Sequence, residues 1–112
     1  MHIDSEDRVE ATRITATLAE LGFVLPGTVL HRHARCGKPN CRCHADPPAL
    51  HPPFWSWTRK VAGRTVTRRL TEDQMRDYQP WFDNSRRLRA LVTELENLSL
   101  RVVEDDPRWG RK

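Results

Sequence analysis

The sequence predicts an α+β protein with an N-terminal helix, a small antiparallel β unit and a long C-terminal helix. Apolar residues at helical spacing near the N-terminus, an alternating stretch with a central glycine turn, and leucines repeated at intervals of three and four predict these parts. At 112 residues we expect one domain, with a core small enough to benefit from a metal or a partner subunit. The predicted parts are a helix over 1–22, a β unit over 28–70, helices over 71–105 and a tail over 106–112.

The N-terminal helix is predicted from the spacing of its apolar side chains. Acidic residues occupy the predicted first turn, where they favour the positive end of the helix dipole, and Gly22 is placed to end the helix. The apolar positions, at intervals of three and four, are Ala11, Ile14, Leu18 and Leu21.

The β unit is predicted as one strand followed by a hairpin. Residues 28–33 alternate and contain β-branched residues, which is typical of a short strand, and residues 54–60 and 65–70 form the two arms of the hairpin. If Ala62 and Gly63 form the tip, aromatic and cationic side chains share one face, because side chains alternate along a strand. That face would carry Trp55, Trp57, Arg59, Val66, Arg68 and Leu70.

The C-terminal region begins with a capping box, Thr71-x-x-Gln74, and continues as helix. Pro80 is expected to kink or restart this helix, because proline cannot donate the backbone hydrogen bond. Beyond it the apolar residues repeat as in a short coiled coil, and we name them the leucine seam: Leu88, Leu91, Leu95, Leu98 and Val102. The seam predicts either a homodimer or other helical partner, or packing against the first helix of the same chain.

All the cysteines of the chain lie within eight residues, at Cys36, Cys41 and Cys43. Thiolates held this close can bind a metal, and one more nitrogen or sulfur donor would complete the tetrahedron of a structural zinc. The odd number of cysteines argues against disulfides, because one thiol would be left over. An iron–sulfur cluster is conceivable with the same ligands, but the set is more typical of zinc.

Four histidines compete to be the fourth ligand, and the sequence leaves the choice between two of them open. His44 is weak because it is bonded directly to Cys43, and His31 lies farther upstream. His33 could reach the metal if the strand end curls over it, whereas His51 is better placed to tie the loop to the hairpin. Four protein ligands leave no open coordination position, and no catalytic triad or phosphate loop is evident, so we do not expect an enzyme.

Positive charge is concentrated in the segment that contains the cysteines. Residues 28–70 carry nine Lys and Arg against the single Asp46, whereas the regions before and after it carry more acids than bases. This pattern predicts binding to nucleic acid, and DNA is favoured over RNA because a two-stranded ribbon fits a major groove. An alternative is a solvated basic surface, which would give the same charge. The candidate contacts are Arg35, Lys38, Arg42, Trp57, Arg59, Lys60, Arg64, Arg68 and Arg69. Trp55 or Trp57 could stack on exposed bases if single strands are bound. In so small a domain, however, at least one tryptophan is expected to pack in the core against the helices, and this expectation is the stronger of the two. The alternative is a zinc-braced interaction or assembly module that acts through the leucine seam.

The N-terminus predicts a cytoplasmic protein. Residues 1–10 are charged and lack the apolar segment of a signal peptide, and no apolar run approaches the roughly 20 residues of a membrane span. A reducing compartment is also where clustered cysteines bind metals rather than form disulfides.

Several of these motifs together resemble an uncharacterised family of small bacterial proteins, often found near mobile-element genes. Its members combine a Cys-Gly-Lys-Pro-x-Cys-x-Cys motif with His-Gly-Pro-aromatic, a hairpin and a leucine-rich helix. The matching segments here are residues 36–43, 51–55, 57–60, 63–67 and 81–89, and the likeness extends over about residues 27–100. The resemblance implies that the ligands are Cys36, Cys41, Cys43 and His51, and it carries no activity. Pro52 stands where the family usually has glycine.

Overall fold

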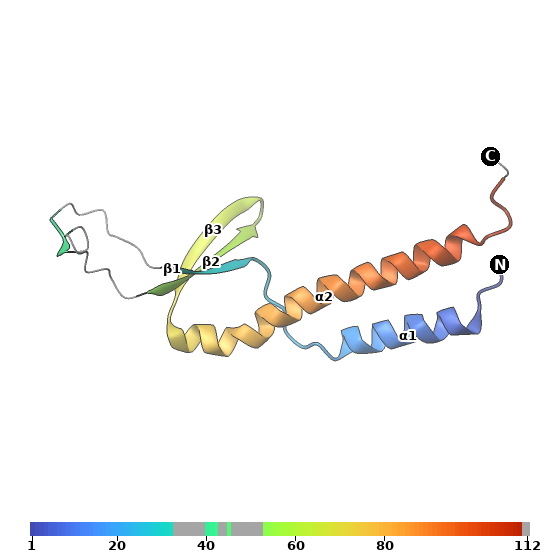
Figure 1. The fold of residues 1–112 in the computed structure, drawn as a ribbon, viewed down its shortest axis with the longest axis horizontal. Coiled ribbons are helices and arrows are strands. Elements are labelled where there is room, and N and C mark those ends of the chain that lie inside the picture. Colours follow the sequence, from blue (N-terminus) through green and yellow to red (C-terminus); the bar gives the residue numbers. More distant parts are fainter. Residues whose placement is uncertain (33–39, 43–44, 46–52, 111–112) are drawn as a thin grey trace. The chain divides into compact units, whose positions relative to one another are not determined.

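The computed structural model describes residues 1–32, 40–42, 45 and 53–110 (Figure 1). It confirms the predicted α+β class, with an N-terminal helix, a three-stranded antiparallel sheet and a long C-terminal helix. In chain order the elements are α1 (Ser5–Ala19), β1 (Thr28–Arg32), β2 (Phe54–Val61), β3 (Arg64–Leu70) and α2 (Glu72–Glu104).

The chain forms two compact units. One, the helical unit, consists of Met1–Leu25 and Trp81–Lys112, and the other, the sheet unit, consists of Pro26–Pro80. Helix α2 belongs to both, because the division falls at Pro80. Each unit is described separately below, and the expectation of one domain stays a prediction.

The core of the helical unit lies between α1 and the C-terminal part of α2. Its most buried side chain, Ile14, is 1% exposed and packs with Leu91 and Leu98. Half-buried apolar residues surround these three, namely Ala11, Leu18, Leu21, Leu95 and Val102. These are the residues at which the sequence has its helical spacing, so the amphipathic prediction for both helices is confirmed.

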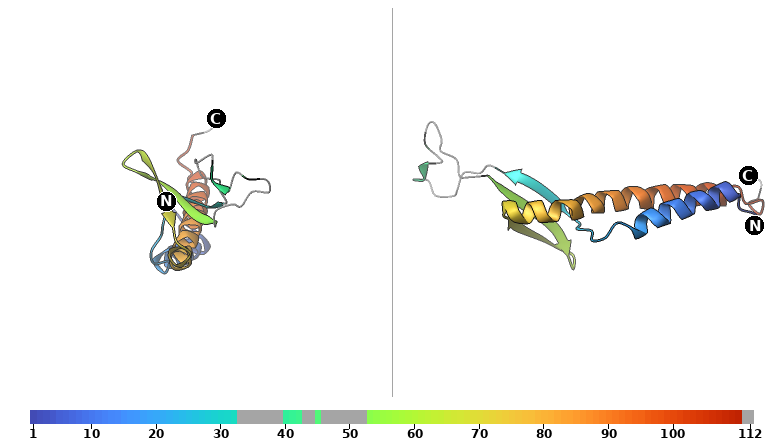
Figure 2. Two further views of the ribbon diagram at one scale, coloured as in Figure 1. Left: turned by 90° about the vertical axis from the view of Figure 1, so that its left-hand side faces the viewer. Right: turned by 90° about the horizontal axis from the view of Figure 1, so that it is seen from below.

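Two ion pairs show that α1 and this part of α2 are antiparallel. Arg101 lies 3.2 Å from Asp7 near the start of α1, and Arg13 lies 3.4 Å from Glu94, one to two turns further along. The numbering therefore rises along α1 as it falls along α2. Both views show the two helices side by side (Figures 1 and 2).

The leucine seam packs within the chain. Of its residues, Leu91, Leu95, Leu98 and Val102 belong to the core with α1, and Leu88 is half-buried. The intramolecular alternative for the seam is therefore confirmed. Self-association through the same residues stays a prediction, and a second copy would have to compete with α1 for them.

The segment after α1 is fixed to α2 by polar and aromatic contacts. Helix α1 ends at Ala19 with Glu20 as its C-cap, three residues before the predicted end at Gly22. Gly22 lies beyond the cap and has a left-handed backbone conformation, with a φ of 79°. The Asn84 side chain donates to the carbonyls of Leu21 and Phe23, at 2.7 and 2.9 Å. The Phe23 ring meets Trp81 edge to face, with centroids 5.2 Å apart. Asn84 thus satisfies two carbonyls that follow the last turn of α1.

The sheet has the strand order β1-β2-β3, and both neighbouring pairs are antiparallel. Val61 pairs with Arg64, so the hairpin turn consists of Ala62 and Gly63, with φ values of 50° and 80°. Positive φ at both central residues is typical of a type I′ turn, which matches the twist of the strands. The predicted tip and the predicted facing of the hairpin side chains are therefore confirmed.

Helix α2 begins with the predicted capping box. The backbone N–H of Gln74 donates to the Thr71 hydroxyl, and the backbone N–H of Thr71 donates to the Gln74 side chain. Of the two alternatives predicted at Pro80, the restart is wrong, because α2 continues through this residue as one helix, whereas a kink there stays a prediction. Proline removes a single backbone donor, so the hydrogen bonds of its neighbours suffice to carry the helix past it.

The predicted charged tail after α2 makes contacts with the helix end. The Trp109 indole N–H donates to the Val103 carbonyl at 2.7 Å, and the Arg108 guanidinium donates to the Asp106 carboxylate. These hydrogen bonds from Arg108 lower the pKa of Asp106. Residues 106–109 thus continue the folded C-terminus beyond α2.

Candidate nucleic-acid interface and metal loop

The register of the sheet divides its side chains into two faces, because residues paired across an antiparallel sheet point the same way. We name each face after a residue of the central strand. The Trp57 face carries Val29, His31, Trp55, Trp57, Arg59, Val61, Arg64, Val66, Arg68 and Leu70. The Phe54 face carries Thr28, Leu30, Arg32, Phe54, Ser56, Thr58, Lys60, Thr65, Thr67 and Arg69.

Side chains of the Trp57 face are engaged in packing within the sheet unit. The Trp57 indole N–H donates to the Pro26 carbonyl at 2.9 Å, and the Arg59 guanidinium lies over the Trp57 ring, 4.2 Å from its centroid. One nitrogen of Arg59, Nη1, is buried and has no hydrogen-bond partner among the described residues. Arg59 therefore contributes to the packing around Trp57.

Trp55 joins the same face to the first turn of α2. Its indole N–H donates to the Glu72 carboxylate at 3.1 Å, and the His31 ring stacks on it with centroids 4.3 Å apart. Leu70, opposite Trp55 in the register, is buried, as is Met75 in α2. The Trp57 face is thus the one that contacts the start of α2, as the burial of aromatic residues in a small domain requires.

The Phe54 face is the more exposed of the two. Its edge-strand residues are exposed, including Leu30 with 48% of its surface accessible, and its central residues Phe54, Ser56 and Thr58 are half-buried. The Arg69 guanidinium lies over the Phe54 ring, 3.8 Å from the centroid. The hydroxyls of Thr58 and Thr67 share a hydrogen bond across the strands. An aromatic ring, an arginine and hydroxyls thus occupy one open surface.

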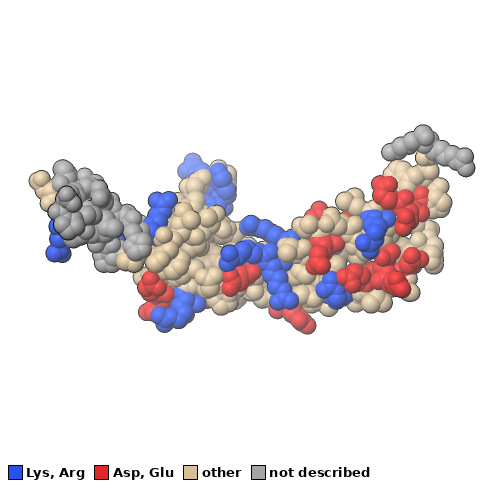
Figure 3. Space-filling view, viewed as in Figure 1, with Lys and Arg blue, Asp and Glu red and all other residues tan. Residues whose placement is uncertain are grey.

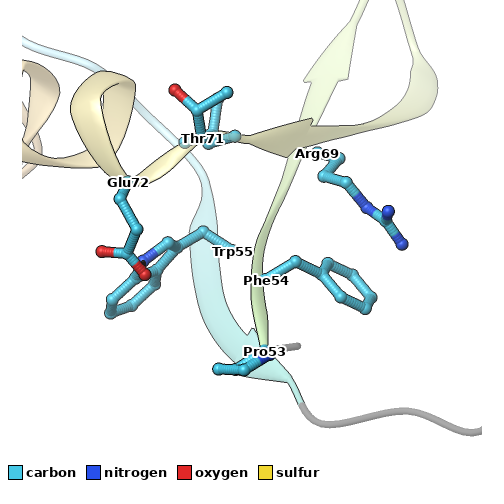
Figure 4. Close-up of a pocket in the computed structure, with 7 residues that line it drawn as sticks. Pro53, Phe54, Trp55, Arg69, Thr71 and Glu72 are labelled. Atoms are coloured by element: carbon cyan, nitrogen blue, oxygen red, sulfur yellow. Dashed lines mark hydrogen bonds between the residues drawn. The ribbon is translucent and has the colours of Figure 1, made fainter. Parts of the chain in front are cut away.

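A hollow of about 300 Å³ lies where β2 begins. Figure 4 shows that Phe54 and Arg69 extend to one side of β2, whereas Trp55 lies on the other side, toward Glu72. The hollow is lined by Pro53, Phe54, Trp55, Arg69, Leu70, Thr71 and Glu72. The stacked pair of Phe54 and Arg69 therefore borders a concave surface.

The cations of the strands lack acidic partners among the described residues, and all of them except the half-buried Arg59 are exposed. The three strands contain six Lys and Arg residues and no acid. Within the described parts of the chain, no ion pair involves Arg32, Arg59, Lys60, Arg64, Arg68 or Arg69, whereas helix residues such as Arg13, Arg86 and Arg101 pair with carboxylates. Figure 3 shows Lys and Arg over the hairpin, and Asp and Glu over α1 and the C-terminal part of α2. The sheet thus presents uncompensated positive charge.

The predicted metal ligands fall almost wholly outside the described residues. This applies to Cys36, Cys43 and His51, to the alternative ligand His33, and to the candidate contacts Arg35 and Lys38. Of the ligand set, the structure places Cys41, which is half-buried, and next to it the exposed Arg42, whose carbonyl accepts from the backbone N–H of Ala45. No potential metal-binding group of three or more side chains occurs among the described residues, so the predicted set remains a prediction.

The sheet does determine where the ligand-bearing segment starts and ends. Arg32, the last residue of β1, is paired with Phe54, the first residue of β2. Residues 33–53 therefore leave and re-enter the sheet at directly opposed positions, about 5 Å apart in such a pair. Any ligands in this segment belong to a loop whose ends the β1–β2 pairing holds together.

Only Lys60 and Arg69 of the Phe54 face are among the contacts predicted from sequence, and the residues that the prediction missed include Leu30, Arg32 and Phe54. The hairpin turn predicted the facing of β2 and β3, but the register of β1 depends on a loop of 21 residues, 33–53. Alternation within Thr28–Arg32 gives two sets of side chains without saying which set joins which face. The one available signal was Arg32 itself, a cation within the basic segment.

Residues 4–79 match the family described as "Domain of unknown function (DUF6788)". No curated protein and no solved structure matches the chain. In the described part of the chain, no helix has the length and apolar character that crossing a membrane requires.

Proposed function

The chain belongs to the DUF6788 family, a domain of unknown function, and we propose that it is a nucleic-acid-binding protein whose basic three-stranded sheet contacts phosphates. This confirms the resemblance to an uncharacterised family, but a family of unknown function supplies no activity. The proposal therefore depends on the chemistry of the sheet.

One observation carries the proposal: the strand cations have no acidic partners among the described residues. Exposed arginines near acids normally form ion pairs, as Arg76 does with Asp73 at the start of α2. Six cations that form no ion pair among the described residues repel one another. A polyanion would relieve this repulsion by neutralising them and releasing its own counterions. Phosphates on a nucleic-acid backbone present negative charge at this density.

The hairpin tip provides the first test. Lys60 and Arg64 are exposed on either side of the turn, and we expect the double variant K60Q/R64Q to weaken binding to a mixed pool of DNA and RNA fragments. If each cation contacts one phosphate, the magnitude of the slope of log Kobs against log salt should fall by about 1.8 for duplex DNA and by about 1.4 for single strands. Fluorescence anisotropy between about 50 and about 200 mM salt would measure this change.

A matched variant controls for total charge. R76Q/R86Q removes two exposed arginines that are paired with Asp73 and Asp83, so the net charge changes by the same amount. We expect this control to keep the wild-type slope within error. An equal loss of affinity in both variants would show a general effect of net charge instead of contacts at the hairpin. Absence of binding to the mixed pool at low salt would refute the proposal.

We further propose that a structural zinc ion in the segment 33–53 braces this sheet. The donor set Cys36, Cys41, Cys43 and His51 has the chemistry of a closed, tetrahedral zinc site. The Arg32–Phe54 pairing supports this, because it already brings the two ends of the segment together and so lowers the entropic cost of gathering the ligands. Such a site would stabilise the loop that carries Lys38 and Arg42 and would have no catalytic position.

Metal content provides the second test. We expect about one zinc per chain by elemental analysis, and its loss in Cys41→Ser, because three ligands hold zinc far more weakly than four. His51→Ala should also lose zinc, whereas the matched variants His33→Ala and His44→Ala should retain it. Zinc loss in His33→Ala alone would reassign the fourth ligand, and iron or no metal in the wild type would contradict the site.

A further inference from the structure

We infer that the Phe54 face binds an unpaired nucleic-acid strand, with a base stacked on the pair formed by Phe54 and Arg69. This inference rests on the proposed nucleic-acid binding and specifies the form of nucleic acid and the surface that takes it. It places base stacking on Phe54 instead of Trp57, the aromatic residue among the contacts predicted from sequence.

The contact between Arg69 and Phe54 is a stack that a base can extend. The guanidinium carbon lies 3.8 Å from the ring centroid, and both residues lie at the hollow where β2 begins. Unpaired bases stack on aromatic rings and on arginine planes alike, whereas bases inside a duplex are stacked on each other and unavailable. Leu30, exposed on the same face, adds apolar surface for a neighbouring base.

Charge on the Phe54 face fits a phosphate backbone. Arg32 and Lys60 are exposed at opposite ends of this face, and Arg69 lies on β3. The described residues of the face include no acid. A strand crossing the sheet would have cations for its phosphates, and the hydroxyls of Ser56 and Thr65 as further hydrogen-bonding groups.

The Trp57 face is the poorer candidate for the same strand. Both of its indole N–H groups already have acceptors within the chain, in Glu72 and Pro26. The Glu72 carboxylate beside Trp55 would also repel a phosphate. The His31 ring already stacks on Trp55, and the half-buried Arg59 already lies over the Trp57 ring.

Neighbouring arginines on opposite faces provide a matched pair of variants. Arg68 and Arg69 are both exposed residues of β3, so R68A and R69A remove the same charge from the two sides of one strand. The probes are a short fluorescein-labelled DNA strand of mixed sequence, its RNA equivalent, and the duplex formed from each. We expect the wild type to bind the single strands more tightly, and R69A to weaken that binding at least about tenfold, as loss of a stacking contact implies. R68A should weaken it only about as much as any loss of one cation.

Phe54 variants separate stacking from charge. Phe54→Trp should retain the preference for single strands, because it keeps an aromatic ring. Phe54→Leu should lose this preference, and we choose leucine instead of alanine because it keeps an apolar side chain for folding. If single strand and duplex bind equally and R68A and R69A behave alike, this inference is overturned while the proposed function stands. Absence of binding to every probe overturns both.

Discussion

Gly27→Ala is expected to destabilise the sheet unit strongly, because the added methyl group meets both backbone strain and close contacts. Gly27 has a φ of 108°, and a Cβ there would lie 2.8 Å from Nε1 of Trp57 and would overlap the carbonyl oxygen of Thr58. Backbone strain of about 1–2 kcal/mol and overpacking of about 1–3 kcal/mol together predict a loss of roughly 3 kcal/mol. The same Cβ would disturb the hydrogen bond from Trp57 to Pro26.

Hydrogen exchange would locate this effect. In Gly27→Ala, the backbone amides of β1, β2 and β3 should lose protection, and urea unfolding should show the lower free energy. Gly22→Ala is the matched control, because Gly22 also has positive φ but its Cβ would meet no atom within 4 Å. We expect it to cost about 1 kcal/mol of backbone strain only. Equal losses in the two variants would show that close packing against Trp57 and Thr58 is unimportant.

Leu98→Ala is expected to have a comparably large effect on the helical unit. Leu98 is 5% exposed and packs in the core with Ile14 and Leu91, so truncation removes apolar burial and leaves a cavity. Substitutions of this kind cost about 2–5 kcal/mol. Thermal unfolding followed by circular dichroism would record the loss of helix at a lower temperature.

Leu100 is the natural control for Leu98. It lies on the same helix two residues away, but 64% of its surface is exposed, so Leu100→Ala should change the free energy of unfolding by less than about 0.5 kcal/mol. If Leu100→Ala were the more damaging variant, the contact between α1 and α2 within one chain would be the wrong account of the leucine seam. Light scattering on both variants would then show whether a second copy covers Leu100.

Local patterns were sufficient to predict most elements of this fold. The helical spacing around Ile14 and Leu98 predicted which faces are buried, and the chemistry of Ala62 and Gly63 predicted the turn and hence the facing of β2 and β3. The prediction that the helix restarts at Pro80 was wrong. Proline removes one backbone hydrogen bond, whereas the other hydrogen bonds of α2 maintain the helix.

The candidate site was less predictable because it depends on contacts distant in sequence. The sequence placed Trp57 with cations on one face, which is correct, but only the hydrogen bond to Pro26 shows that Trp57 serves packing. The Phe54 face could not be predicted, because its composition depends on the pairing of Arg32 with Phe54, which are separated by residues 33–53. The metal ligands were identified by their chemistry alone, and three of the four lie outside the described residues.

The position of β3 at the edge of the sheet gives its arginines a second consequence. An edge strand exposes unpaired backbone groups that can recruit another chain into a continuous sheet, and charged side chains are a common guard against this aggregation. Arg64, Arg68 and Arg69 occupy three of the seven positions of β3. Neutral substitutions of these arginines would remove both the affinity for phosphate and the charge repulsion that opposes pairing between edge strands. Arg→Glu substitutions would remove the affinity for phosphate, but the like charges would still oppose pairing between two copies of β3. Solubility should therefore separate the two kinds of variant even where nucleic-acid binding does not.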